Sequence, residues 1–97
     1  MIRSFHDKAT EDVFNGEDTK AARRVLPGTL WKVAGRKLEA LDSAGELRDL
    51  RAPVSNHLEA LKKDRAGQYA IRINDQYRIC FVWTPDGPER VEITDYH

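Results

Sequence analysis

The sequence has 97 residues, of which 40 % are hydrophobic and 33 % charged, and its formal net charge is zero. This length suits one domain, so we expect residues 1–97 to form a single domain and not two. The longest apolar run, ICFVW, is too short to cross a membrane, and no secretory leader is apparent, so we expect a cytoplasmic protein without membrane contact.

The N-terminal part of the chain carries signals for short elements. MIRSF has apolar residues at its second and fifth positions and is expected to join a sheet as an edge strand. Two short helices are predicted over residues 8–15 and 20–26. Asp7 is placed to cap the first helix, and Asp18 or Thr19 to cap the second, because their side-chain oxygens accept from free N–H groups at a helix start.

The clearest helix follows Pro27-Gly28. Thr29 is expected to cap it, and apolar residues recur at helical spacing from Leu30 to Leu41. Ser43-Ala44-Gly45 then ends it. ELRDLRAP adds one or two turns at most, and the segment up to Gln68 is expected to be mainly a connector with a short extended piece near residues 57–61.

The pattern then changes to period two. Strands are predicted over residues 69–73, 77–83 and 90–96, joined by NDQ and PDG turns into an antiparallel meander. Helices followed by such a meander define an α+β domain, with the N-terminal strand and helices packed on the C-terminal sheet. Cys80, the only cysteine, lies in an apolar strand and is expected to be a buried structural thiol.

Basic residues are concentrated between positions 20 and 37, where no acidic residue occurs. A protein that binds a polyanion needs a local positive face and not a positive total charge. An ordinary solvated helix surface would have the same composition, so both interpretations stay open. The residues concerned are Lys20, Arg23, Arg24, Lys32, Arg36 and Lys37.

Two strand arginines are a second basic feature. Arg72 and Arg78 flank a tight turn on the face opposite the large apolar residues, so pairing of their strands brings them together. They would then either share an anion or pair with acids of the last strand, such as Glu92. The connector adds further cations at one end of the sheet, namely Lys62, Lys63 and Arg65.

The chain ends on Asp95, Tyr96 and His97. Histidine acts as a general acid or base near neutral pH, and a nearby carboxylate raises its pKa. Alternation places Tyr96 on the face of the arginines and the other two residues on the opposite face, unless the tail curls. An ordinary surface tail is the alternative. His57 is a further candidate, and no histidine pair has a metal-ligand spacing, so we predict no metal.

The run NHLEALKKDRAGQYAIRINDQYRICFVW, followed by VEITDYH, resembles HigB-type toxins of the RelE/ParE superfamily. KAARRVLPGTLWKVAGRKLEALDSAGELRDLRAP resembles them as well, so the similarity covers nearly the whole chain. It implies a small RelE-like α+β domain that is the toxic half of a toxin–antitoxin pair. It also implies entry into the ribosomal A site and cleavage of translated mRNA without a metal or other cofactor.

The resemblance extends to individual residues. Arg72 and Arg78 match basic strand positions of the family, and Lys62 and Arg65 match basic connector positions. The terminal Asp95, Tyr96 and His97 match an acid–Tyr–His ending. Some relatives have a catalytic histidine where this chain has Glu59, and His57 stands two residues earlier.

These residues support a hypothesis for RNA cleavage. His97 would transfer a proton and Asp95 would orient it, Tyr96 would position the nucleotide, and the strand arginines would hold the scissile phosphate. The connector cations and the basic run would bind RNA backbone. The alternatives are a ParE-like gyrase inhibitor without nuclease activity and a weakened toxin retained for antitoxin binding. The partner implied by the resemblance is a HigA-like helix-turn-helix antitoxin.

Overall fold

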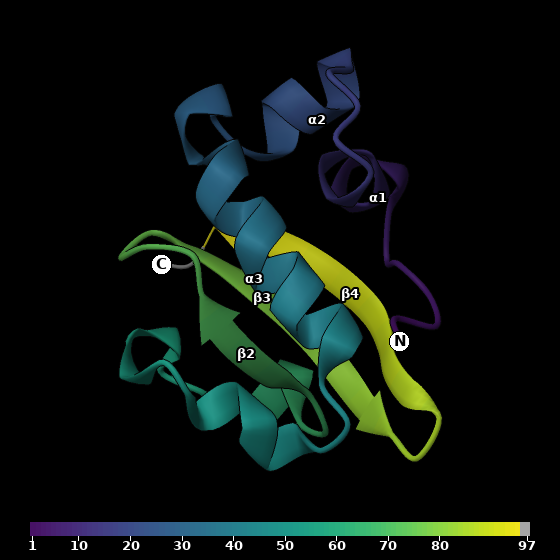
Figure 1. Ribbon diagram of the computed structural model, residues 1–97, viewed down its shortest axis with the longest axis vertical. Helices are drawn as coiled ribbons and strands as arrows, with labels where there is room; N and C mark the ends of the chain where they lie inside the picture. Colours follow the sequence, from purple (N-terminus) through teal and green to yellow (C-terminus); the bar gives the residue numbers. More distant parts are fainter. Residues whose placement is uncertain (96–97) are drawn as a thin grey trace.

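A computed structural model describes residues 1–95 as helices followed by a four-stranded antiparallel sheet of order β1-β2-β3-β4 (Figure 1). The predicted α+β class is confirmed. The helices are α1 (Lys8–Phe14), α2 (Lys20–Val25) and α3 (Trp31–Ser43), and the 3-10 turns are η1 (Gly28–Leu30), η2 (Leu47–Arg51), η3 (Val54–Asn56) and η4 (Lys63–Arg65). The strands are β1 (Glu59–Ala60), β2 (Tyr69–Arg72), β3 (Tyr77–Thr84) and β4 (Gly87–Asp95).

The first two helices start at side-chain caps. Asp7 accepts from the backbone N–H of Thr10 at 2.7 Å, as predicted. For α2 the cap is Thr19, whose hydroxyl accepts from Ala22 N–H at 3.1 Å. The other candidate, Asp18, forms an ion pair with Arg23. Both caps satisfy N–H groups that have no partner within the helix.

The prediction that Thr29 caps the third helix is wrong. Thr29 lies inside η1, and α3 begins at Trp31 without a side-chain cap. The N–H of Leu30 bonds to the carbonyl of Pro27 at 2.9 Å, and the N–H of Trp31 bonds to Gly28. These i to i+3 bonds satisfy the donors that a capping hydroxyl would otherwise serve.

Helix α3 lies across one face of the sheet (Figure 1). Its residues Ala34, Leu38 and Leu41 are fully buried in the core. The sheet contributes Ile71, Ile79, Phe81, Val91 and Ile93 to the same core. Burial of this apolar surface is the main stabilising term for a domain of this size.

The meander strands pair in the predicted order, and the two strand arginines are adjacent as predicted. Arg72 is opposite Arg78 in the β2–β3 pair, and Arg78 is opposite Thr94 in the β3–β4 pair. Because side chains alternate along a strand, Arg78 and Cys80 lie on the face away from α3, whereas Ile79 lies in the core. The meander therefore has one face covered by a helix and a second face that carries the polar residues.

The edge strands differ from the prediction. The fourth strand of the sheet is β1, beside β2, and not the N-terminal segment. The N-terminal segment runs parallel to β4 and, within residues 1–95, forms one isolated bridge with it, between Phe5 and Val91. Arg90 has a left-handed φ of 54°, which interrupts the extended backbone of β4 beside this segment.

The N-terminal segment nevertheless follows β4 closely. The N–H of Arg3 bonds to the carbonyl of Pro88 at 2.8 Å, and that of His6 bonds to Val91 at 2.9 Å. Gly87, at φ +125°, lies under this segment, and a side chain there would collide with the Met1 carbonyl. Only glycine suits that backbone and that contact. Among residues 1–95, no helix is long and apolar enough to span a membrane.

Candidate active-site groove

An open groove of about 740 Å³ lies on the sheet face opposite α3. Its walls come from β1, the connector after it, the first half of β3 and the end of β4. The predicted candidates that line it come from distant parts of the chain. The lining residues are Glu59, Ala60, Leu61, Lys62, Lys63, Asp64, Arg65, Arg78, Cys80, Thr94 and Asp95.

Arg78 is the buried cation of the groove. Only 6 % of the residue is exposed, and its Nε lies 3.5 Å from Oε1 of Glu59 on β1. Arg72 is its register partner, but its side chain is 35 % exposed, and its Nη1 lies 3.8 Å from Asp75 in the turn. The backbones are adjacent as predicted, yet of these two arginines only Arg78 lines the groove.

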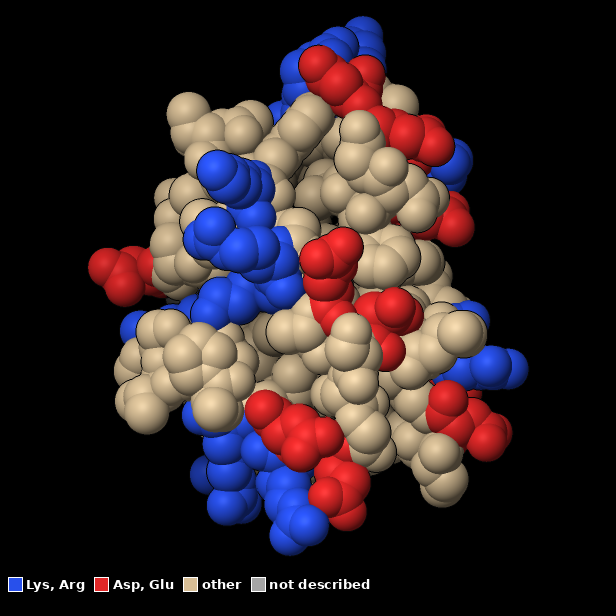
Figure 2. Space-filling model, in the orientation of Figure 1, with Lys and Arg blue, Asp and Glu red and all other residues tan. Residues whose placement is uncertain are grey.

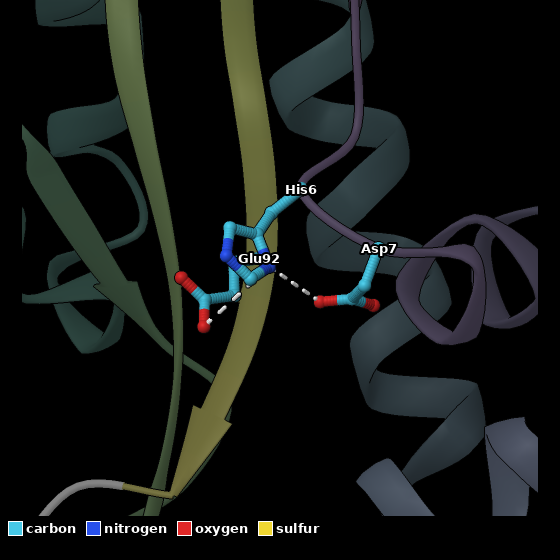
Figure 3. A group of neighbouring side chains, drawn as sticks. All are labelled: His6, Asp7 and Glu92. Atoms are coloured by element: carbon cyan, nitrogen blue, oxygen red, sulfur yellow. Dashed lines mark hydrogen bonds and ion pairs between the residues drawn. The ribbon is translucent and has the colours of Figure 1, made fainter.

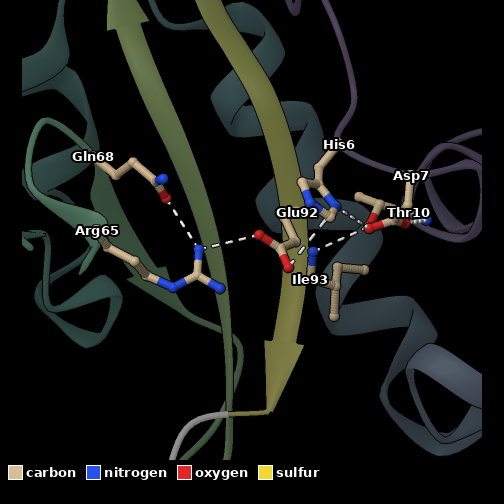
Figure 4. A network of polar contacts seen from close by, with 7 residues as sticks. All are labelled: His6, Asp7, Thr10, Arg65, Gln68, Glu92 and Ile93. Carbon is tan, nitrogen blue, oxygen red and sulfur yellow. Dashed lines mark hydrogen bonds and ion pairs between the residues drawn. The ribbon is translucent and has the colours of Figure 1, made fainter.

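The connector places Lys62 and Arg65 in the groove wall. Nη1 of Arg65 donates to Glu92 Oε1 and to Gln68 Oε1, both at 3.1 Å (Figure 4). The hydrogen bond that Arg65 donates to Glu92 raises the pKa of Arg65 and outweighs the opposing effect of burial. Glu92 was predicted as a partner for the strand arginines, and the structure pairs it with Arg65.

A cluster at the edge of β4 continues this network. Nδ1 of His6 donates to Asp7 Oδ2 at 3.0 Å and lies 3.9 Å from Glu92 Oε2 (Figure 3). Three ligand atoms from these residues lie within 4.8 Å of one another, which is a spacing that a metal ion can use. The Arg65 guanidinium already supplies positive charge to Glu92, so we interpret the cluster as an ion-pair network.

Sequence reasoning misses this cluster. His6 looks like an ordinary surface residue in the sequence, because only the folded chain brings the N-terminal segment beside β4. The period-two pattern does place Glu92 on the face of Arg78, which is the one local signal for its role. No pattern in the sequence indicates a contact between residues separated by more than 80 positions.

The end of β4 carries Asp95 into the groove lining. Regular pairing extends to this residue, which is opposite Tyr77, and Asp95 Oδ2 accepts from Gln76 Nε2 at 3.0 Å. The predicted roles of Tyr96 and His97 fall outside the described residues.

Glu59 and His57 differ in position although they are two residues apart. Glu59 lines the groove beside Arg78. His57 is exposed, has a left-handed backbone with φ 46°, and is not among the residues that line the groove. Of these two candidates for proton transfer, the structure therefore brings Glu59 to the buried arginine.

The basic run of residues 20–37 belongs to the helices, and Figure 2 shows Lys and Arg side chains gathered on the face that carries α3. Lys37 is partly buried and donates to Asn56 Oδ1, and its burial lowers the pKa. Arg23 pairs with Asp18. The fold separates this run from the groove by the thickness of the sheet and helix layers. Its exposed members are Lys20, Arg23, Arg24, Lys32 and Arg36.

Cys80 is buried, as predicted, with 2 % of the residue exposed. Burial raises the pKa of its thiol, so the protonated form is favoured. The unexpected feature is its place in the groove lining, where it lies on the same strand as Arg78 and opposite Glu92 of the paired strand.

The groove combines cations with carboxylates on an open sheet face. Guanidinium and ammonium groups bind phosphate oxygens, and carboxylates orient or exchange protons. The side chains are held by one another, through the Arg65 hydrogen bonds and the ion pair between Arg78 and Glu59. A helix-covered antiparallel sheet with such a basic groove fits the RelE-like class of small toxins.

Comparisons with known proteins agree with that class. Residues 3–97 match the profile of the HigB-like toxin family, described as the RelE-like toxin of the type II toxin–antitoxin system HigB. The chain belongs to this family. Toxin HigB-1 of Vibrio cholerae is 40 % identical over 83 residues, which cover 86 % of this chain and 84 % of that protein. An uncharacterized protein of Haemophilus influenzae is 41 % identical over 56 residues, which cover 58 % of this chain and 55 % of that protein.

Proposed function

We propose that this HigB-family toxin is a ribosome-dependent endoribonuclease that cuts mRNA in the A site without a metal ion. The observation that carries the proposal is the groove in which Lys62, Arg65 and Arg78 lie together with Glu59 and Asp95. This arrangement offers positive charge for a phosphate and carboxylates beside it. An RNA substrate supplies its own nucleophile, the 2′-hydroxyl.

The proposed reaction is an in-line attack of the 2′-oxygen on the adjacent phosphorus. The 2′-oxygen loses its proton to a base, the bond to the 5′-oxygen breaks, and an acid protonates that leaving oxygen. The products are a 2′,3′-cyclic phosphate and a 5′-hydroxyl. Charge that develops on the phosphoryl oxygens is stabilised by Arg78, whose burial keeps water from screening its charge.

Two groups are needed for proton transfer. We assign His97 as one of them, oriented by Asp95, and Glu59 as the candidate for the other because it lies 3.5 Å from the arginine that would hold the phosphate. Tyr96 would position the nucleotide by stacking or hydrogen bonding. Arg72 would add positive charge from the turn side.

Binding to the ribosome is assigned to both basic surfaces. Lys62 and Arg65 would contact mRNA backbone in the groove, and the exposed cations of the helix face would contact ribosomal RNA. A toxin of a type II system implies an antitoxin partner. We propose a HigA-like helix-turn-helix protein that represses the gene pair.

Exchange of His97 tests the proposal. His97→Ala should remove growth inhibition and lower cleavage of ribosome-bound mRNA by about 10²–10⁴-fold, the usual contribution of one acid–base group. Primer extension after induction measures the cuts, and thermal unfolding with antitoxin binding shows that the variant folds. Wild-type cleavage by His97→Ala would disprove the assignment. If the wild type caused DNA damage without mRNA cuts, it would be a gyrase inhibitor. If it caused neither DNA damage nor mRNA cuts, it would be a weakened toxin.

A further inference from the structure

Glu92 is the point where the groove and the N-terminal segment meet (Figure 4). Its Oε1 accepts from Arg65 Nη1 at 3.1 Å, and its Oε2 lies 3.9 Å from His6 Nδ1. The side chain is 19 % exposed. Glu92 is opposite Cys80 in the β3–β4 pair, so it projects from the same sheet face as Arg78.

We propose that Glu92 is a positioning residue that fixes the Arg65 guanidinium in the groove wall for contact with the RNA backbone. This inference rests on the proposed nuclease function and gives a role to a residue that the family resemblance does not single out. Glu92 acts through Arg65 and does not itself exchange a proton with the substrate. His6 and Asp7 support the carboxylate from the other side of β4.

The placement of Arg65 explains why it needs a fixed partner. Arg65 ends η4, a single 3-10 turn in a connector whose Lys63 has a left-handed φ of 56°. An arginine side chain has many rotamers, and restricting them before RNA binds reduces the entropy cost of binding. β4 is a paired strand, so Glu92 offers a rigid base that the connector lacks.

The hydrogen-bond geometry leaves the guanidinium available to RNA. Within residues 1–95, the hydrogen bonds of the Arg65 side chain to Glu92 and to Gln68 both use Nη1. Nε and Nη2 therefore remain for a phosphate, in the fork geometry that arginine offers and lysine does not. A carboxylate so close to an anion site repels the substrate, so the benefit of Glu92 must come from orientation.

Two substitutions of Glu92 should differ in their effect on KM. Glu92→Gln keeps an acceptor oxygen for Arg65 and removes the negative charge, so KM for ribosome-bound mRNA should stay near the wild-type value. Glu92→Ala releases Arg65, and KM should rise about tenfold, the effect of one hydrogen bond to a charged group. In both variants kcat should be unchanged, because contacts equal in ground state and transition state affect only KM.

A double-mutant cycle with Arg65→Ala tests the coupling. If Glu92 acts through Arg65, the double variant should have the KM of Arg65→Ala alone, so the two effects are not additive. The control is Glu89→Ala, a half-buried glutamate of β4 that is opposite Val82, and it should leave KM unchanged. Thermal unfolding of each variant monitors folding, and Glu92→Thr replaces Glu92→Ala if the alanine variant does not fold.

Three results would overturn the inference. The first is a wild-type KM for Glu92→Ala, and the second is an equal impairment of cleavage in Glu92→Gln and Glu92→Ala. The third is additive effects on KM in the double-mutant cycle. If Glu92→Gln and Glu92→Ala lowered kcat equally and left KM unchanged, Glu92 would be a catalytic residue. Failure of the wild-type protein to cut ribosome-bound mRNA would instead overturn the proposed function and the inference with it.

Discussion

At the scale of single residues, burial distinguishes two arginines that the strand register makes neighbours. Arg78 is buried beside Glu59 in the groove, whereas Arg72 is more exposed and lies near Asp75. We expect Arg78→Ala to lower single-turnover cleavage by about 10²–10³-fold, as when one donor to a developing oxyanion is removed. Arg72→Ala should have a clearly smaller effect, because water screens an exposed charge.

Purified toxin acting on programmed ribosomes gives both rates. Arg51→Ala is a suitable control because Arg51 is an exposed arginine of η2 outside the groove. Equal losses for Arg72→Ala and Arg78→Ala would show that position in the register, and not burial, determines the contribution to cleavage.

The same two residues show what the sequence predicts about a site. Alternation along a strand is local, so the face and register of Arg72 and Arg78 followed from the order of residues. The difference in burial between the two arginines does not follow from the order of residues, because it depends on β1 and the connector folding over Arg78. The Arg65–Glu92–His6 network needs three segments in contact, and no local pattern specifies such contacts.

At the scale of elements, a buried aspartate joins α1 to α2. Asp12 Oδ1 lies 2.9 Å from Lys8 Nζ, and Oδ2 accepts from the Thr19 hydroxyl that caps α2 at 2.7 Å. These contacts hold the pKa of Asp12 below its ordinary value of 3.8, and the contact with Lys8 has the largest effect. The stabilisation is therefore present above that ordinary value and is lost as pH falls through the lower pKa of the folded protein.

Asp12→Asn should accordingly lower the melting temperature by several degrees at neutral pH. The difference from the wild type should shrink below about pH 4, because the wild type then loses the same charge. Asp18→Asn is the matched control, since Asp18 is an exposed acid beside the same helix. Thermal unfolding over a pH series measures the effect. A difference that grows on acidification would contradict the role given to Asp12.

Local signals account for most of the elements. The sequence indicates Asp7 as a cap and narrows the second cap to Asp18 or Thr19, because a cap depends on residues three positions away. Thr29 does not cap α3, because the 3-10 turn η1 satisfies the N–H groups that a capping hydroxyl would otherwise satisfy. The predicted N-terminal edge strand is wrong for a different reason. β1 and the N-terminal segment are both short, and only tertiary contacts decide which one pairs fully.

At the scale of the whole molecule, a zero net charge conceals two basic surfaces. Lys62 and Lys63 belong to the groove, and Lys32 and Arg36 are exposed on α3 on the opposite side of the sheet. A toxin enclosed by ribosomal RNA would use both surfaces, but in the proposed function only the groove surface would be near the reacting phosphate. Long-range attraction depends on total charge, whereas cleavage depends on where the charge lies.

Two double variants with the same change in net charge separate these effects. Lys32→Gln/Arg36→Gln should raise KM and leave kcat unchanged. The dependence of log KM on log salt concentration should become shallower, by a slope of about 0.7–0.9 for each phosphate that is no longer neutralised. Lys62→Gln/Lys63→Gln should in addition slow single-turnover cleavage at saturating toxin, because in the proposed function the groove would orient the scissile phosphate. Cleavage on programmed ribosomes at several salt concentrations measures both. Identical behaviour of the two variants would mean that the cations act only by steering, since the total charge is then the sole property that matters.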